Sequence, residues 1–410
     1  MNTDILVIGG GISGLTAAIE AAETGYDVIL VEKNPYLGGR VTQLTRYFPK
    51  LCPPYCGLEI LFKRLQNCRN LKYLTMAEVK KVSGSPGNFN VTVEIKPRFV
   101  TDACTGCGEC VKVCPVEVPN DFNFGMDKRK AIYIPHEMAF PPLYVIDGNA
   151  CKGKECGKCL SVCKYNAINL DMKPETITIN AKAIIVATGW SPYDATKLDN
   201  LGFGKYKNVI TNMMMERLAS PNGPTKGKIV RPSDGKEPKT VAFVQCAGSR
   251  DENHLPFCSA ICCLASMKHA LYIREQIPDS KVFIFYIDIR AYGRYEDFFR
   301  KVVEDENIQF IKGKVAKIEE TKDGNLIVYA EDISSGKRIS MEVDMVVLAT
   351  GMQPTTAINK IEGLDYDEFG FVIEREGIAV AGVARKPADV ASCNQDATGA
   401  VLRAIQIVRR

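Results

Sequence analysis

Cysteines are the residues best placed to do chemistry in this 410-residue chain, which contains sixteen of them. Eight form two runs with thiols three to five residues apart. The first run is Cys104, Cys107, Cys110 and Cys114, followed by Pro115, and the second is Cys151, Cys156, Cys159 and Cys163. The spacing of the first run is typical of [4Fe–4S] ligands, and the second is a slightly widened copy of it. Such grouping favours metal ligation in a reducing compartment over disulfides.

Two runs of this kind share their ligands, because the fourth Cys of one run binds the cluster of the other. We therefore expect a ferredoxin-type segment with two [4Fe–4S] clusters. One cluster takes Cys104, Cys107, Cys110 and Cys163. The other takes Cys151, Cys156, Cys159 and Cys114. Zinc is the alternative, since four thiolates also suit a tetrahedral zinc ion.

Four further cysteines fall where an expected strand ends and a helix begins: Cys246, Cys258, Cys262 and Cys263. They could hold a third [4Fe–4S] cluster, although adjacent ligands at 262 and 263 are unusual, and buried free thiols are the alternative. Cys52 and Cys56 lie in a proline-bent loop. Three roles are open for them: a redox pair that faces a flavin, additional metal ligands, or a structural role in the loop. The remaining thiols and the three histidines are expected to be isolated, on the surface or in packing: Cys68, Cys393, His136, His254 and His269.

A glycine-rich turn near the N-terminus predicts a dinucleotide site. The apolar run 5–8 leads into Gly9, Gly11 and Gly14, and Ile12 and Ser13 open a helix. In a strand–turn–helix, the first Gly makes the tight turn, the second lets backbone N–H groups reach a pyrophosphate, and the third allows close packing. A second apolar run, 28–31, ends on Glu32, which is placed to bind the ribose hydroxyls. The alternative is a turn without a ligand.

The residues that follow indicate FAD. The stretch from Glu32 to Arg40, with Lys33, Gly38 and Gly39, resembles the continuation found in flavoprotein disulfide reductases and amine oxidases. Two Ala-Thr-Gly turns resemble the domain junctions of the same flavoproteins, and Gly377 to Gly382 resembles their final FAD strand. The residues that this resemblance adds to the FAD site are Ala187, Thr188, Gly189, Gly351 and Gly382. The acid usual after that last Gly is Val383 here, and Asp389 or Asp396 are possible substitutes.

The order of these features predicts an α/β fold: a thioredoxin-reductase-like flavoprotein with two dinucleotide-binding domains and an inserted ferredoxin-type 2[4Fe–4S] domain. Strands are expected at 241–244, 282–286, 308–311 and 345–348, with a helix over 264–275. The expected boundaries are 1–95, 173–204 and 352–410 for the FAD-binding domain, 96–172 for the insert and 205–351 for a central domain. That central domain lacks a nicotinamide phosphate loop after its first strand, so no direct nicotinamide chemistry is expected.

Bulk composition excludes several classes of partner. The 52 basic and 48 acidic side chains give a net charge of +4, which indicates neither nucleic acid nor an anionic membrane surface. No apolar run approaches the roughly 20 residues of a membrane span, and the N-terminus enters a strand directly. We therefore expect a cytoplasmic protein. No hydrolytic or acyl-transfer constellation is evident, and no catalytic residue is assigned.

Taken together, the glycine loop, the two Cys runs and the segments 246–250 and 258–263 resemble the A-type subunit of heterodisulfide reductase. Within that family, 47–54 and 249–256 are similar to the quinone-interacting membrane-bound oxidoreductases. That resemblance implies an electron-transfer subunit whose partners are a quinone-reactive membrane subunit and a second subunit with flavin and iron–sulfur clusters. It further implies electron exchange between menaquinone and adenylylsulfate reductase in sulfur metabolism, at the inner face of the cell membrane, and it favours a cluster at Cys246.

Two other functional classes compete with this hypothesis. One is a stand-alone FAD and iron–sulfur reductase of a disulfide or another small molecule, with Cys52 and Cys56 as its dithiol. The other is a scaffold with vestigial cofactors, which the intact glycine loop and eight intact cluster ligands disfavour.

Overall fold

A computed structural model describes residues 1–410, and the chain forms two compact units within it. The first unit comprises Met1–Thr42, Tyr55–Trp190 and Pro354–Arg410, and the second comprises Gln43–Pro54 and Ser191–Gln353. None of the helices is both long enough and apolar enough to cross a membrane.

The first unit is built on one seven-stranded sheet with the order β3-β2-β1-β10-β5-β4, and β21 pairs with β10. Its strands are β1 (Asn2–Ile8), β2 (Val28–Val31), β3 (Leu71–Leu74), β4 (Ala77–Ser85), β5 (Asn88–Ile95), β10 (Glu175–Val186) and β21 (Ile378–Val380). β1 runs parallel to β2 and β10, as a dinucleotide-binding fold requires. The first half of β10 pairs antiparallel with β5, and its second half pairs parallel with β21.

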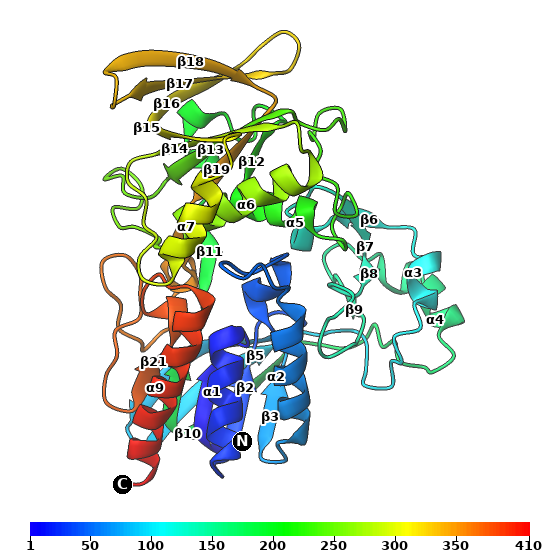
Figure 1. Ribbon diagram of the computed structural model, residues 1–410. Helices are drawn as coiled ribbons and strands as arrows, with labels where there is room; N and C mark the ends of the chain where they lie inside the picture. The colour runs from blue at the N-terminus through cyan, green and yellow to red at the C-terminus, as the bar shows by residue number, and fades with distance from the viewer. The chain divides into compact units, whose positions relative to one another are not determined.

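Three helices cover this sheet, α1 (Ile12–Glu23), α2 (Tyr55–Asn67) and α9 (Val390–Val408), and α1 lies between the other two (Figure 1). β1 is buried on both faces, with Ile5, Leu6 and Val7 fully inaccessible. This burial explains its continuous apolar run, because parallel strands covered on both sides do not alternate. The small side chains of α1 allow that helix to lie close to the sheet and to α9.

The insert belongs to the first unit and contains little regular structure. Each Cys run contains one short helix that begins just before its third cysteine, α3 (Glu109–Val113) in the first run and α4 (Lys158–Val162) in the second. The two helices lie side by side (Figure 1). Two small antiparallel sheets connect them, formed by β6 (Glu117–Pro119), β7 (Lys128–Lys130), β8 (Ile132–Tyr133) and β9 (Val145–Ile146). The insert's core consists of Val100, Ile132, Tyr144 and Ile146 together with cysteine side chains.

A parallel five-stranded sheet with the order β12-β19-β13-β14-β15 forms the centre of the second unit. Its strands are β12 (Val209–Thr211), β13 (Thr240–Ala247), β14 (Lys281–Tyr286), β15 (Ile308–Lys312) and β19 (Met345–Thr350). Helices α5 (Asn212–Ala219), α6 (Cys262–Gln276) and α7 (Tyr295–Val303) accompany it. An antiparallel meander of β16 (Val315–Glu320), β17 (Leu326–Asp332) and β18 (Lys337–Val343) packs on its other face.

Two longer segments lie in the second unit, although the sequence placed them in the FAD-binding domain. Residues 191–204 belong to the second unit, because Tyr193, Leu198 and Leu201 are buried in its core. The segment Gln43–Pro54 also belongs there, because Thr45 donates its N–H to Glu216 at 2.9 Å. Strands β11 (Trp190–Pro192) and β20 (Met352–Pro354) pair where the chain passes between the units, and α8 (Thr355–Ile358) follows.

Candidate cofactor sites

The glycine turn between β1 and α1 is folded against itself. A Cβ on Gly14 would lie 1.7 Å from the carbonyl oxygen of Gly9, so only Gly allows this contact. A Cβ on Gly11 would meet nothing closer than the Cα of Gly39 at 3.9 Å, so the backbone there is open to a ligand. Gly11 caps α1 without a side-chain hydrogen bond, which leaves N–H groups of the first turn available to a phosphate.

Glu32 lies at the end of β2 and is only 5% exposed. Its carboxylate accepts hydrogen bonds from the N–H of Gly10 at 2.6 Å and from the N–H and the side-chain amide of Asn34 at 2.7 Å each. Burial raises the pKa of Glu32, although these donors oppose the rise. Oε1 accepts both bonds from Asn34, so a lone pair on Oε2 remains for a ribose hydroxyl. Asn34 was missed in the sequence, where only its position after Glu32 could have indicated a role.

The continuation after Glu32 folds back over the glycine turn. Gly38 donates its N–H to Gly10 at 2.8 Å, and a Cβ on Gly39 would lie 2.8 Å from the Cα of Gly11. The Nε of Arg40 donates to the carbonyl of Trp190 at 3.3 Å. Lys33 is exposed. These contacts bring the expected Gly38–Gly39–Arg40 sequence beside the expected pyrophosphate position.

Two further segments of the first unit border the same turn. A Cβ on Gly9 would lie 2.3 Å from the carbonyl oxygen of Ala187, and a Cβ on Gly382 would lie 2.2 Å from the Oγ of Ser13. The neighbouring Thr188 has a buried hydroxyl without a hydrogen-bond partner in the protein. A buried hydroxyl needs a partner, so this atom fits a hydrogen bond to a bound ligand.

The structure places the other FAD candidates as follows. Asp396 accepts the N–H of Gly382 at 2.8 Å, whereas Asp389 caps α9. Gly189 follows β10 with φ +65°. Gly351 lies in the second unit, where a Cβ on it would lie 2.2 Å from the Oγ of Ser249 and 3.1 Å from the Oγ of Ser259.

The insert contacts the segment that follows Glu32. Phe140 accepts the N–H of Leu37 at 2.8 Å, and its ring stacks on Phe62 with centroids 4.8 Å apart. One guanidinium nitrogen of Arg98 donates to the carbonyl of Pro35 at 2.5 Å and to the hydroxyl of Thr75 at 2.8 Å. The insert and the FAD segment are therefore joined directly within the first unit.

We predict that Arg98→Ala weakens FAD binding about tenfold. Charge-assisted hydrogen bonds contribute roughly 1.5–3 kcal/mol each. Without the bonds from Arg98, part of this energy no longer holds the FAD-binding segment in its bound conformation. FAD affinity is measured by flavin fluorescence during dilution, with Arg69→Ala, an exposed arginine, as the matched control. Equal FAD affinity in the two variants would show that the insert does not support the flavin site.

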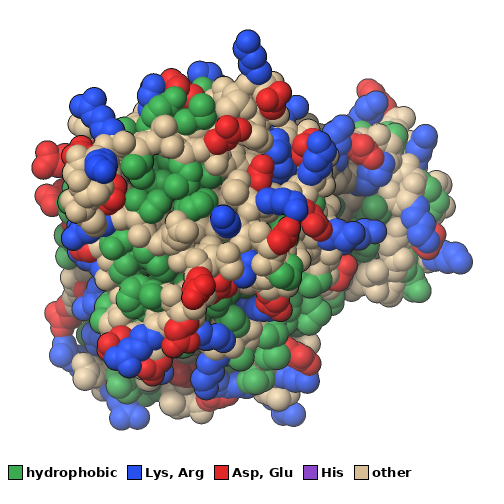
Figure 2. Space-filling view, turned by 45° about the horizontal axis from the view of Figure 1, so that its top comes forward, with side chains coloured by type: hydrophobic (Ala, Val, Ile, Leu, Met, Phe, Trp, Pro, Cys, Tyr) green, Lys and Arg blue, Asp and Glu red, His purple; other side chains and the backbone are tan.

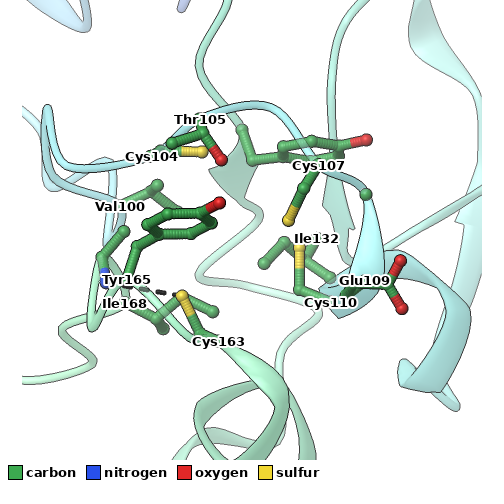
Figure 3. Close-up of a pocket in the computed structure, with 13 residues that line it drawn as sticks. Val100, Cys104, Thr105, Cys107, Glu109, Cys110, Ile132, Cys163, Tyr165 and Ile168 are labelled. Carbon is green, nitrogen blue, oxygen red and sulfur yellow. Dashed lines mark hydrogen bonds between the residues drawn. The ribbon is translucent and has the colours of Figure 1, made fainter.

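Four thiols from both Cys runs line one pocket of about 350 Å³, counting the part open to solvent. They are Cys104, Cys107, Cys110 and Cys163. Figure 3 shows their sulfur atoms directed toward the same space, among the side chains of Val100, Ile132 and Ile168. This set is the crossed set that the spacing predicts for one cluster.

Neighbouring thiols also surround Cys159. Burial raises its pKa, and the proximity of Cys151 and Cys114 raises it further. These three belong to the second crossed set, and Cys156 follows the short helix η3 (Gly153–Glu155). Backbone N–H groups donate to two of the expected ligand sulfurs, Gly153 to Cys151 and Ala167 to Cys163, both at 3.4 Å. Such bonds stabilise thiolates and tune cluster potentials.

The thiols of the insert are not grouped closely enough to bind a single zinc ion directly. Zinc–sulfur bonds of about 2.3 Å would bring four sulfurs to within about 4 Å of one another. No group of three or more Cys, His, Asp or Glu side chains in the chain is placed to hold one ion. Burial and the neighbouring Cys104 raise the pKa of Cys110 to about 11, so that thiol keeps its proton until a cation replaces it.

Another thiol group lies in the second unit, where β13 ends and α6 begins. Burial raises the pKa of Cys262 well above its ordinary value, and Cys246, Cys263 and Cys258 raise it further. Cys246 has φ +57°, and its pKa is raised to about 11, chiefly by burial. Ala260 donates its N–H to the sulfur of Cys258 at 3.3 Å. All four thiols are therefore neighbours.

The remaining cysteines and the histidines have varied surroundings. Cys52 and Cys56 are exposed and belong to different units, Cys68 is partly exposed, and Cys393 is buried near Gly382. His269 is 1% exposed and bonds to Glu216, whose carboxylate also pairs with Lys268. His254 bonds to the hydroxyl of Tyr193, and His136 stacks on Phe122. Every histidine thus has a packing or hydrogen-bonding role.

Comparison with known proteins supports both kinds of cofactor. The family model for FAD dependent oxidoreductase matches residues 4–55, and the 4Fe-4S dicluster domain model matches residues 103–168. Among solved structures, the thioredoxin reductases of Lactococcus lactis and T. acidophilum align with TM-scores of 0.56 and 0.55. Each alignment covers 99% of this chain. The L. lactis enzyme is 14% identical and is covered over 99% of its length, and the T. acidophilum enzyme is 16% identical and is covered over 98% of its length.

The fold and these sites define a flavin and iron–sulfur oxidoreductase with a thioredoxin-reductase-like fold and an inserted dicluster domain. Its sequence is 43% identical over 416 residues to the A-type iron–sulfur subunit of the CoB–CoM heterodisulfide reductase of Methanocaldococcus jannaschii. It is 41% identical over 416 residues to the A-type subunit of the H(2):CoB–CoM heterodisulfide,ferredoxin reductase of Methanothermobacter thermautotrophicus. The matches cover 96% and 97% of this chain, and the chain spans 63% of each relative. Over almost its whole length the chain is therefore similar to the A-type subunits of heterodisulfide reductase.

Proposed function

We propose that this protein is the FAD and iron–sulfur electron-transfer subunit of a membrane-attached complex that passes electrons between the menaquinone pool and adenylylsulfate reductase. The observation that carries the electron-transfer role is the crossed thiol set, Cys104, Cys107, Cys110 and Cys163, in an insert bonded directly to the FAD segment. FAD exchanges electrons in pairs or singly, whereas iron–sulfur clusters pass them one at a time. The residues of this chain hold both in one unit.

In this proposal FAD and each iron–sulfur cluster are held by separate sets of residues. Gly9 to Gly14 and Glu32 hold the pyrophosphate and ribose of FAD, and Thr188 offers a hydroxyl to the bound ligand. The two crossed Cys sets hold the insert's clusters. The thiols around Cys262 hold a third cluster, supported by their mutual proximity and burial.

Partner identity rests on the segments Tyr47 to Pro54 and Ser249 to Pro256, which are similar to the quinone-interacting oxidoreductases. A second subunit with flavin and iron–sulfur clusters completes the complex, together with a quinone-reactive membrane subunit. They hold this chain at the inner face of the cell membrane.

A reconstituted transfer assay tests the proposal. The complex is isolated anaerobically from its source cells and mixed with a menaquinol analogue and adenylylsulfate reductase. We expect transfer that depends on the complex and that falls at least tenfold with Cys163→Ala. Absence of transfer between these two partners would overturn their assignment. Reduction of CoB–CoM heterodisulfide would then connect the protein with the activity named for its relatives, and disulfide turnover by the isolated chain would favour a stand-alone reductase.

A further inference from the structure

An exposed basic surface surrounds the second Cys run. Residues 151–165 contain four lysines and one glutamate, whereas the first run from 104 to 115 contains one of each. The segment 151–165 thus has an excess of three positive charges, compared with a net charge of +4 for the whole chain. Figure 2 shows Lys and Arg side chains along the part of the molecule at the right of the view, which α3 and α4 occupy in Figure 1.

Three of these lysines are exposed and form no ion pair. They are Lys152, Lys158 and Lys164. The fourth, Lys154, pairs with Asp171 at 2.6 Å. In the first run, Glu109 pairs with Lys112 at 2.6 Å, and Lys164 adds a weaker attraction that helps to lower the pKa of Glu109. The surface near the second run therefore keeps an excess of positive charge.

Two apolar side chains are exposed among these lysines. Leu160 is 39% exposed and Tyr165 is 50% exposed. Leu160 directly follows Cys159, and Tyr165 lines the pocket of the other thiol set. A protein bound over these two side chains would approach both sets of ligand thiols. We call Lys152, Lys158, Leu160, Lys164 and Tyr165 the lysine face.

We propose that the lysine face is the docking surface for an acidic one-electron carrier protein. This inference rests on the proposed electron-transfer function and adds where the insert meets its redox partner. Weak redox complexes bury small interfaces, and a small apolar centre within a charged rim suits them. Complementary charge raises the association rate roughly 10- to 1,000-fold, and the effect falls steeply with salt.

The test uses the full chain, loaded with its clusters, and reduced flavodoxin as an acidic protein donor. One electron leaves the reduced flavodoxin and enters a cluster, and loss of cluster absorbance is followed in a stopped-flow mixer. Lys158→Glu/Lys164→Glu is expected to lower the bimolecular rate constant at least tenfold at low salt. At about 0.5 M salt the difference should shrink to less than threefold, because the Debye length falls to a few ångströms.

Two controls separate docking from damage. Lys72→Glu/Lys322→Glu makes the same change in charge at exposed lysines outside the insert and should leave the rate within twofold. Reduced methyl viologen, a small cationic donor that needs no docking surface, should reduce the lysine-face variant no more slowly than the native protein. If the Glu variant loses iron, Lys158→Gln/Lys164→Gln decides instead, with an expected drop of about threefold at low salt.

Equal flavodoxin rates in the lysine-face and control variants would overturn the docking proposal alone. A native protein without iron and acid-labile sulfide would overturn the proposed function itself, so the two failures are distinguishable.

Discussion

Gly11→Ala is expected to leave the chain folded and to weaken FAD binding about tenfold to a hundredfold. The new methyl group has room within the protein, since its nearest neighbour would be the Cα of Gly39 at 3.9 Å. It would instead occupy the side from which a pyrophosphate must approach, and overpacking of this size costs about 1–3 kcal/mol. The measurement is the FAD content of the purified variant, together with its circular dichroism spectrum.

Two other glycines of the first unit provide the comparison. Gly57→Ala lies in α2 with no atom within 4 Å of its Cβ and should keep full FAD content. Gly14→Ala would place a methyl group 1.7 Å from the carbonyl oxygen of Gly9 and should disturb the fold itself. Full retention of FAD by Gly11→Ala would contradict the assignment of the glycine turn to FAD.

The second large effect is a pattern of iron loss. Cys107→Ala and Cys163→Ala should each remove about four iron atoms, and the double variant should lose no more, because both thiols belong to one cluster. Cys107→Ala combined with Cys159→Ala should remove about eight, because these thiols belong to different crossed sets. Cys107 and Cys163 belong to different Cys runs, so their substitution would remove the same iron atoms only if the two runs share ligands.

Iron is measured per chain after anaerobic purification, with flavin content as the internal reference. A Cys107→Ala/Cys163→Ala variant that loses about eight iron atoms would show that the two thiols serve separate clusters, and the crossed pattern would then be wrong.

Sequence reasoning predicted the features that depend on neighbours along the chain. The strand, glycine turn and helix at the N-terminus form from one short stretch, and β1, α1 and β2 lie where the apolar runs indicate. The expected strands and the helix of the second unit are present for the same reason, as β13, β14, β15, β19 and α6. The meander of β16, β17 and β18 was not predicted, and in β16 a register shift between Val315 and Lys317 breaks the period-two pattern.

Contacts between distant segments could not be predicted. The bond from Leu37 to Phe140 uses only backbone atoms, so no side-chain pattern indicates it. Glu216 is buried in α5 because Lys268, on another helix, pairs with its carboxylate and His269 hydrogen-bonds to it. Contacts between two helices leave no local signal in the sequence. Burial alone would raise the pKa of Glu216, but these two partners lower it to about 2. Gly351 resembles Gly189 in local sequence, yet the two lie in different units.

Analysis of iron, acid-labile sulfide and flavin in the anaerobically purified protein tests the central claim most directly. We expect about twelve iron atoms, about twelve sulfides and one FAD per chain, and about eight iron atoms in a Cys262→Ala variant. About eight iron atoms in the native protein would remove the third cluster and leave the two-cluster electron path. Zinc in place of iron without acid-labile sulfide, or a protein without flavin, would contradict the account.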